Sequence, residues 1–83
     1  MDFRVYVIVE MPIIDKKYEL LVPIDRRIHE VIKVLKKAVP ELNNGYYSTN
    51  IPCLYSKSTG KMYSMNEIVK NSNIKTGTRL VLL

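Results

Sequence analysis

The stretch DRRIHEVIKVLKKAV, which runs from Asp25 to Val39, decides the fold because it has the only strong helical pattern in the sequence. Asp25 is expected to cap this helix, since its carboxylate can accept hydrogen bonds from the N–H groups of the first turn. Pro40 cannot continue the helix. The apolar residues recur every three or four positions, which places them in one stripe that must pack on other elements: Ile28, Val31, Ile32, Leu35, Ala38 and Val39.

Alternating residues before this helix predict two β-strands. Successive side chains of a strand point to opposite faces, so one set in each strand faces the core. We expect strands over residues 3–10 and 18–22, paired antiparallel through a connection of hairpin length that contains Pro12. The sets placed in the core are Phe3, Val5, Val7 and Val9 in the first strand, and Tyr18, Leu20 and Val22 in the second.

Turn-forming residues divide the segment after the helix into short elements. The Asn-Asn-Gly at residues 43–45 is a strong turn signal. We expect a short strand over residues 53–56 that returns over residues 61–64, so that the two form a hairpin with a short loop. A short helical turn is expected over residues 66–72.

The last strand is expected over residues 78–83, after a tight turn at Gly77, where glycine can adopt a positive φ. A strand this apolar fits the middle of a sheet better than an exposed edge. Beside the first strand it would run parallel to it, with the helix in a right-handed crossover. The sequence thus predicts an α+β fold of the β-grasp type, a mixed sheet of four to five strands with one helix packed across it.

Composition limits the classes of protein to which the chain can belong. Its 83 residues, 47% hydrophobic and 25% charged, fit a single domain over residues 1–83. No apolar run approaches the ~18 residues that suggest a membrane span, and the N-terminus does not resemble a signal peptide. A single cysteine favours a reducing compartment. With one cysteine and one histidine we expect no zinc site, and no cofactor.

The closing segment, from Ile68 to Leu83, resembles the end of ubiquitin-like proteins. In that family an apolar residue, a short turn, an Asn/Gly-Ile step and a final strand of alternating leucines occur at this spacing, here with Ile74 at the step. The strand–strand–helix opening, with Pro23-x-Asp25 before the helix, fits the same family. The resemblance implies the β-grasp fold over nearly the whole chain.

Within this family the sequence is most similar to small bacterial YukD-like (EsaB-like) proteins, which share the closing pattern Ile-x-x-Gly-x-Arg-Leu. The pattern residues here are Ile74, Gly77, Arg79 and Leu80. Those relatives are cytosolic and linked to type VII secretion in Gram-positive bacteria. The resemblance implies a cytoplasmic, non-catalytic interaction module whose partner is another protein of that secretion system. The oligomeric state stays open.

The end of the sequence departs from one branch of the family. Conjugated ubiquitin-like modifiers and related sulfur carriers end in a flexible Gly-Gly tail, because their carboxylate is adenylated and passed to a thiol. This sequence ends at Leu83, inside the expected last strand, with no glycine after Gly77. We therefore expect neither conjugation nor sulfur transfer. A modifier or carrier truncated before its tail is the alternative.

The outward face of the expected sheet is the best candidate for a binding site, because a contiguous exposed apolar patch usually marks an interaction. Its predicted residues are Tyr6 and Ile8 on the first strand with Val81 and Leu83 on the last. Tyr55 or Leu54 joins them, depending on the register of the third strand. Arg4 and Arg79 are expected at the rim, where charge sets the orientation of a partner. The family resemblance implies the same face.

A small nucleic-acid-binding domain is a further alternative, because the net charge is +5. Tyr46, Tyr47 and Tyr55 near Lys57 and Lys61 suggest base stacking beside phosphate contacts. Tyrosines in a loop are more often folded onto the core, so nucleic acid is the less favoured partner.

The sequence gives catalysis little support. His29 and Glu30 are adjacent on the helix and therefore do not face each other. A lone cysteine such as Cys53 is most often a small packing residue. We expect no enzyme activity.

Overall fold

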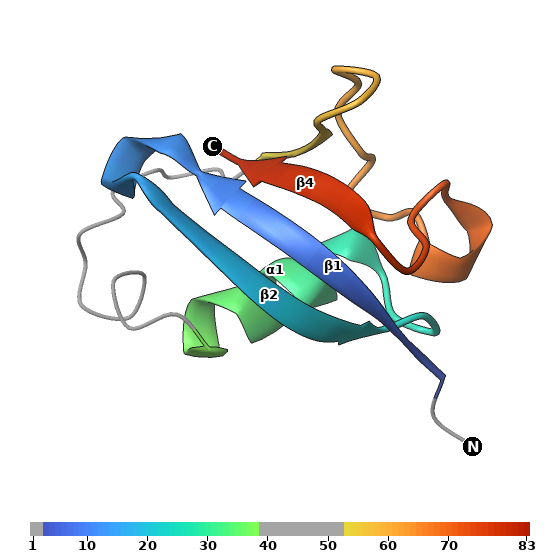
Figure 1. Ribbon diagram of the computed structural model, residues 1–83. Helices are drawn as coiled ribbons and strands as arrows, with labels where there is room; N and C mark the ends of the chain where they lie inside the picture. Colours follow the sequence, from blue (N-terminus) through green and yellow to red (C-terminus); the bar gives the residue numbers. More distant parts are fainter. Residues whose placement is uncertain (1–2, 39–52) are drawn as a thin grey trace.

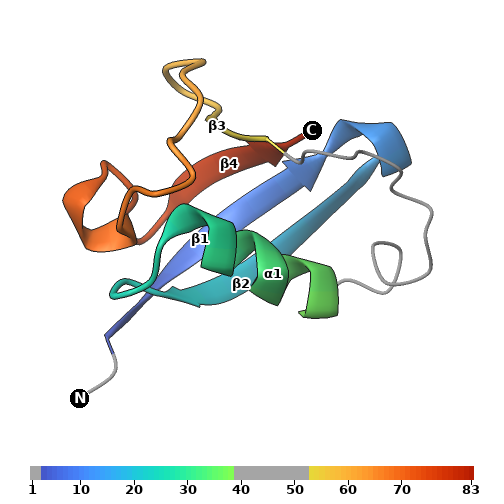
Figure 2. The same cartoon turned by 180° about the vertical axis from the view of Figure 1, so that it is seen from behind.

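The computed structural model describes residues 3–38 and 53–83 and folds them into one sheet with a helix across it (Figure 1). In chain order the elements are β1 (Arg4–Met11), the 3-10 helix η1 (Pro12–Ile14), β2 (Lys16–Pro23), α1 (Ile28–Ala38), β3 (Leu54–Ser56), the 3-10 helix η2 (Val69–Asn71) and β4 (Thr78–Leu82). The strand order is β2-β1-β4-β3. Helix α1 lies across one face of the sheet, as the view from behind shows (Figure 2). The predicted α+β architecture is confirmed.

The first two strands form the predicted antiparallel hairpin, with Val7 opposite Leu20. The connection is the 3-10 helix η1, which begins with Pro12, a residue whose fixed φ suits a first helical turn. Asp15 ends it in the left-handed conformation at φ 53°, and its N–H donates to the carbonyl oxygen of Pro12 at 3.2 Å. The hairpin therefore closes through a compact turn.

β4 lies in the middle of the sheet, between β1 and β3, as predicted. It runs parallel to β1, with Ile8 opposite Arg79. It runs antiparallel to β3, with Val81 opposite Tyr55. The turn before β4 places Gly77 at φ 91°, which glycine adopts at little cost. β4 thus connects β3 with the hairpin of β1 and β2.

The hydrophobic core lies between α1 and the inner face of the sheet. The side chains with relative exposure below 2% are Val7, Val9, Met11, Val22, Ile28, Val31, Leu35, Leu54, Val69, Leu80 and Leu82. The predicted helical stripe accordingly supplies Ile28, Val31 and Leu35, together with Ile32 at 3%. Val39 and Pro40, like the turn expected at residues 43–45, lie outside the described residues.

The prediction that Asp25 caps the helix is wrong. The helix begins at Ile28, and its first N–H groups bind carbonyl groups from a distant segment. The N–H of Ile28 donates to the carbonyl oxygen of Glu67 at 2.9 Å. The N–H of His29 donates to that of Met65 at 3.1 Å. These carbonyl oxygens accept hydrogen bonds from N–H groups of the first turn, which a capping side chain would otherwise accept.

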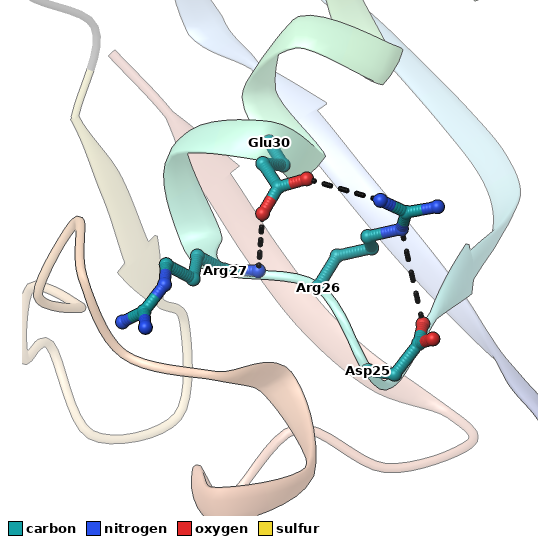
Figure 3. Close-up of polar contacts among 4 residues, drawn as sticks. All are labelled: Asp25, Arg26, Arg27 and Glu30. Carbon is teal, nitrogen blue, oxygen red and sulfur yellow. Dashed lines mark hydrogen bonds and ion pairs between the residues drawn. The ribbon is translucent and has the colours of Figure 1, made fainter.

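Local polar contacts at the helix start come from Glu30 (Figure 3). Its Oε1 accepts a hydrogen bond from the N–H of Arg27 at 3.4 Å. Its Oε2 accepts one from Nη1 of Arg26 at 3.3 Å. Asp25 lies 3.9 Å from Nε of Arg26, and because both side chains are well exposed this pair contributes little to stability.

Two strand predictions need correction. Phe3 was placed in the core, but it is 60% exposed because β1 begins only at Arg4. Its carbonyl oxygen still accepts the N–H of Ile24 at 3.1 Å. The return strand expected over residues 61–64 is reduced to one isolated bridge, between Tyr55 and Met62.

Backbone hydrogen bonds hold the segment after β3 against that strand around the isolated bridge. The N–H of Gly60 donates to the carbonyl oxygen of Ser56 at 2.8 Å, and the N–H of Ser56 donates to that of Lys61 at 2.9 Å. The N–H of Tyr63, whose ring is 7% exposed, donates to the carbonyl oxygen of Leu54 at 2.9 Å. The described part of the sheet has four strands.

Candidate protein-binding face

Side chains of all four strands that point away from α1 form the outer face of the sheet, which faces the viewer in Figure 1. The register arranges them in rows across the strands. The first row comprises Leu21 and Tyr6, the second Glu19, Ile8 and Arg79, and the third Lys17, Glu10, Val81 and Tyr55. This face therefore carries both apolar and charged residues.

The structure places the predicted site residues on this face without aligning them in one row. Ile8 lies opposite Arg79, so Val81 is displaced from Ile8 along β4. Val81 lies opposite Tyr55, and Leu54 is fully buried. The register of the third strand, left open by the sequence, thus makes Tyr55 the outward residue.

The remaining predicted residues lie toward the two ends of the face. Tyr6 lies opposite Leu21, which is 58% exposed and which the sequence reasoning did not count as a site residue. Leu83 follows β4, is 40% exposed, and exchanges two backbone hydrogen bonds of 2.9 and 3.0 Å with Cys53. Arg4 is exposed at the start of β1, at the opposite end of the sheet.

Glu10 is a polar residue of the outer face that the sequence reasoning missed. Its Oε2 lies 2.7 Å from Nζ of Lys57, its Oε1 lies 3.5 Å from Nζ of Lys17, and its side chain is only 16% exposed. The hydrogen bond from Lys57, followed by the attraction of both cations, lowers the pKa of Glu10 despite its partial burial. Strand alternation alone indicates that Glu10 points outward, but not which lysines reach it.

A second polar contact involves the predicted residue Tyr6. The carboxylate of Glu19 on β2 accepts a hydrogen bond from its phenol and raises the pKa of Tyr6, with a smaller contribution from burial. The phenol is therefore a hydrogen-bond donor at neutral pH.

The two arginines predicted at the rim, Arg4 and Arg79, both have exposed side chains. No salt bridge joins either of them to a described residue. Arg79 is the more central, because it lies beside Ile8 in the second row. Its guanidinium can form a bidentate ion pair, with two parallel hydrogen bonds, to a carboxylate of a partner.

Three of the residues considered for nucleic-acid binding lie in the described part of the chain. Tyr55 lies on the outer face, and the ammonium group of Lys57 is paired with Glu10 of the same face. Lys61 is exposed beyond the turn. Tyr46 and Tyr47 lie outside the described residues.

The two side chains considered for catalysis lie on different elements. His29 is half-buried in the first turn of α1, and Cys53 is half-buried just before β3. Within residues 3–38 and 53–83, no three His, Cys, Asp or Glu side chains group closely enough to hold a metal ion. None of the described helices is both long and apolar enough to cross a membrane.

Comparison with known proteins identifies the fold. No protein-family model and no curated protein matches the sequence. A solved structure described as molecular mimicry of SUMO that promotes DNA repair matches with a TM-score of 0.76 at 14% identity, over 96% of this chain and 90% of that chain. The UBL domain of Plasmodium falciparum Dsk2 matches with a TM-score of 0.69 at 13% identity, over 98% of this chain and 100% of its own.

The chain therefore has the ubiquitin-like β-grasp fold. The same fold occurs in a chain of the toluene 4-monooxygenase HD complex with the inhibitor 4-bromobenzoate, with a TM-score of 0.76 at 7% identity over 96% of each chain. At such identities the likeness establishes the fold alone, and because one of these neighbours belongs to an enzyme complex, function has to be argued from the surface.

Proposed function

We propose that this chain is a non-catalytic interaction module that binds another protein through the outer face of its sheet. The observation that carries the proposal is that apolar side chains occupy a sheet face on which no described helix lies (Figure 1). Leu21 is 58% exposed and Leu83 is 40% exposed, while Tyr6, Ile8 and Val81 are half-buried. Apolar side chains on an open face are ordinarily covered by a partner.

The proposed mechanism is burial of a few apolar anchors inside a polar rim. Ile8, Val81 and Tyr55 lie on the three adjacent strands β1, β4 and β3 and serve as the central anchors. Arg4, toward one end of the face, and Arg79, beside Ile8, supply positive charge that orients the partner. Because Glu10 is already paired with Lys17 and Lys57, no isolated carboxylate has to be desolvated at this place when a partner docks.

We further propose that the partner is a component of a bacterial type VII secretion system and that the chain acts in the cytoplasm. The support is the closing pattern of Ile74, Gly77, Arg79 and Leu80 that the sequence shares with YukD-like proteins. Ile74 and Leu80 are buried and Gly77 holds the turn, so these three residues maintain the fold. Arg79 is the pattern residue exposed on the outer face, and it is the one that can contact the partner.

The test compares outer-face variants with a matched helix variant. Ile8→Ser and Val81→Ser together remove apolar surface from the face. Val34→Ser removes the same kind of surface from α1, where Val34 is 41% exposed. Each protein is first checked for folding by thermal unfolding, and its affinity for purified cytosolic domains of type VII secretion components is then measured.

The outer-face variant is expected to bind at least about ten-fold more weakly than wild type, as loss of interface anchors usually does. Val34→Ser is expected to bind like wild type. Equal losses in both variants would refute the outer face as the site. If wild type bound none of the components, the secretion partner would be wrong.

A further inference from the structure

A basic groove borders the outer face at the start of β4. Its volume is about 770 Å³, and it lies between residues 56–58 at the end of β3 and residues 72–79 leading into β4. Arg79 belongs both to this groove and to the outer face. A segment that crosses the outer face can therefore continue into the groove.

The wall formed by residues 72–79 is held in place by its own hydrogen bonds. The Oγ of Ser72 accepts the N–H of Ile74 at 3.1 Å, and the side chain of Ile74 is buried in the core. The N–H of Lys75 donates to Oγ1 of Thr78 at 2.9 Å. The N–H of Gly77 donates to the carbonyl oxygen of Tyr6 at 2.7 Å, which ties the wall to β1. A preformed wall reduces the ordering cost of binding.

The charge of the groove is one-sided. Its lining includes Lys57, Lys75 and Arg79 and, among the described residues, no carboxylate. Glu10 compensates Lys57 from the outer face at 2.7 Å. No salt bridge joins Lys75 or Arg79 to a described residue, so their charges face solvent across a concave surface. Such a surface concentrates anionic groups.

We propose that this groove binds a run of aspartate or glutamate residues in an extended segment of a protein partner. The inference rests on the proposed function, because it assigns this segment to the protein that docks on the outer face. Ser58, Asn73 and Thr76 add hydrogen-bonding groups that suit a peptide main chain. None of the described lining residues is aromatic, whereas single-stranded nucleic acids are usually bound by aromatic stacking. The lining therefore favours an acidic peptide.

The test titrates the isotope-labelled full chain with a capped hexaglutamate peptide and follows backbone amide shifts by NMR. Hexaglutamate carries no apolar side chain, so it tests the groove without the apolar anchors of the outer face. The largest shifts are expected at residues 57–58 and 72–79. Lys75→Glu with Arg79→Glu is expected to weaken binding roughly ten-fold or more, since each surface ion pair contributes a modest amount. Lys33→Glu with Lys36→Glu changes the net charge equally on the exposed side of α1 and is expected to have little effect.

Further measurements distinguish the groove proposal from the outer-face proposal. The outer-face variant with Ile8→Ser and Val81→Ser is expected to bind hexaglutamate like wild type, so the groove can be confirmed even if the outer-face proposal fails. Shifts spread over the whole surface, or equal losses in both charge-reversal variants, would overturn the groove proposal. Stronger binding of an oligothymidylate with the same number of charges would overturn it in favour of nucleic acid.

Discussion

The carboxylate of Glu10 on β1 lies 2.7 Å from the ammonium nitrogen of Lys57, which follows β3. Because β4 runs between β1 and β3, this ion pair spans β4 on the outer face of the sheet. Lys17 on β2 lies 3.5 Å from the same carboxylate. One side chain thus connects the N-terminal hairpin with the turn that borders the basic groove.

Removing this carboxylate should make stability less dependent on pH. The pKa of Glu10 is lowered from its ordinary 4.5, chiefly by the hydrogen bond from Lys57. Its ionised form therefore stabilises the folded state above the unfolded-state pKa, and this contribution is lost as the pH falls through the folded-state pKa. We expect the unfolding free energy of the Glu10→Gln variant to be below that of wild type at about pH 7, and the difference to be smaller at about pH 3. Urea denaturation at both pH values measures it.

The partner in this ion pair can be tested with the same measurement. Lys57→Met, alone and combined with Glu10→Gln, completes a double-mutant cycle that isolates the coupling between the two side chains. A stability difference between Glu10→Gln and wild type that did not change with pH would show that Glu10 is not stabilised in its ionised form.

Asp25→Ala should barely change stability, because Asp25 does not cap the helix. We expect a loss below about 0.5 kcal/mol, against about 1 kcal/mol for removal of a true N-cap. Ser72→Ala should cost about 1 kcal/mol or more, since the Ser72 hydroxyl donates to the carbonyl oxygen of Val69 at 2.6 Å and accepts the N–H of Ile74. Chemical denaturation measures both, and a larger loss for Asp25→Ala would contradict the described helix start.

Gly77→Ala should destabilise the turn before β4 through its backbone alone. A Cβ added at Gly77 would meet nothing within 4 Å, so no steric clash is involved. The positive φ of 91° is unfavourable for alanine, which costs about 1–2 kcal/mol. Thermal unfolding should show a similar loss for Gly60→Ala, at φ 73° in equally open space. No loss at either position would contradict these turn conformations.

Leu80→Ala should be severely destabilising, because β4 is an inner strand of the sheet and Leu80 is fully buried. We expect a loss of about 2–5 kcal/mol from the cavity and the lost burial. Leu21→Ala is the matched control on the edge strand β2, where the side chain is 58% exposed and the expected loss is about 0.5 kcal/mol or less. Urea denaturation distinguishes the two, and equal losses would place Leu80 outside the core.

Local patterns in the sequence predicted most of the fold. The spacing of Ile28, Val31 and Leu35 and the alternation of Leu80 with Leu82 depend on helix and strand geometry, which repeats over a few residues. The apolar character of the last strand was enough to place it in the middle of the sheet. These features need no knowledge of distant contacts, which explains why the structure confirms them.

The features that the sequence did not reveal depend on contacts between distant segments. The helix begins at Ile28 because carbonyl groups of Met65 and Glu67 receive its first N–H groups. Glu10 is paired because the turn after β3 brings Lys57 to it, although they are 47 residues apart. No local pattern in the sequence predicts either contact. The basic groove was missed for the same reason.

Photo-crosslinking in cells that express the full chain tests the proposed outer-face docking most directly. A benzophenone amino acid at position 21, on the outer face, is compared with one at position 34, on α1, both of which replace well-exposed apolar residues. The account predicts a discrete covalent adduct with one partner protein from position 21 and none from position 34. Adducts from position 34 alone, or the same adducts from both positions, would contradict it.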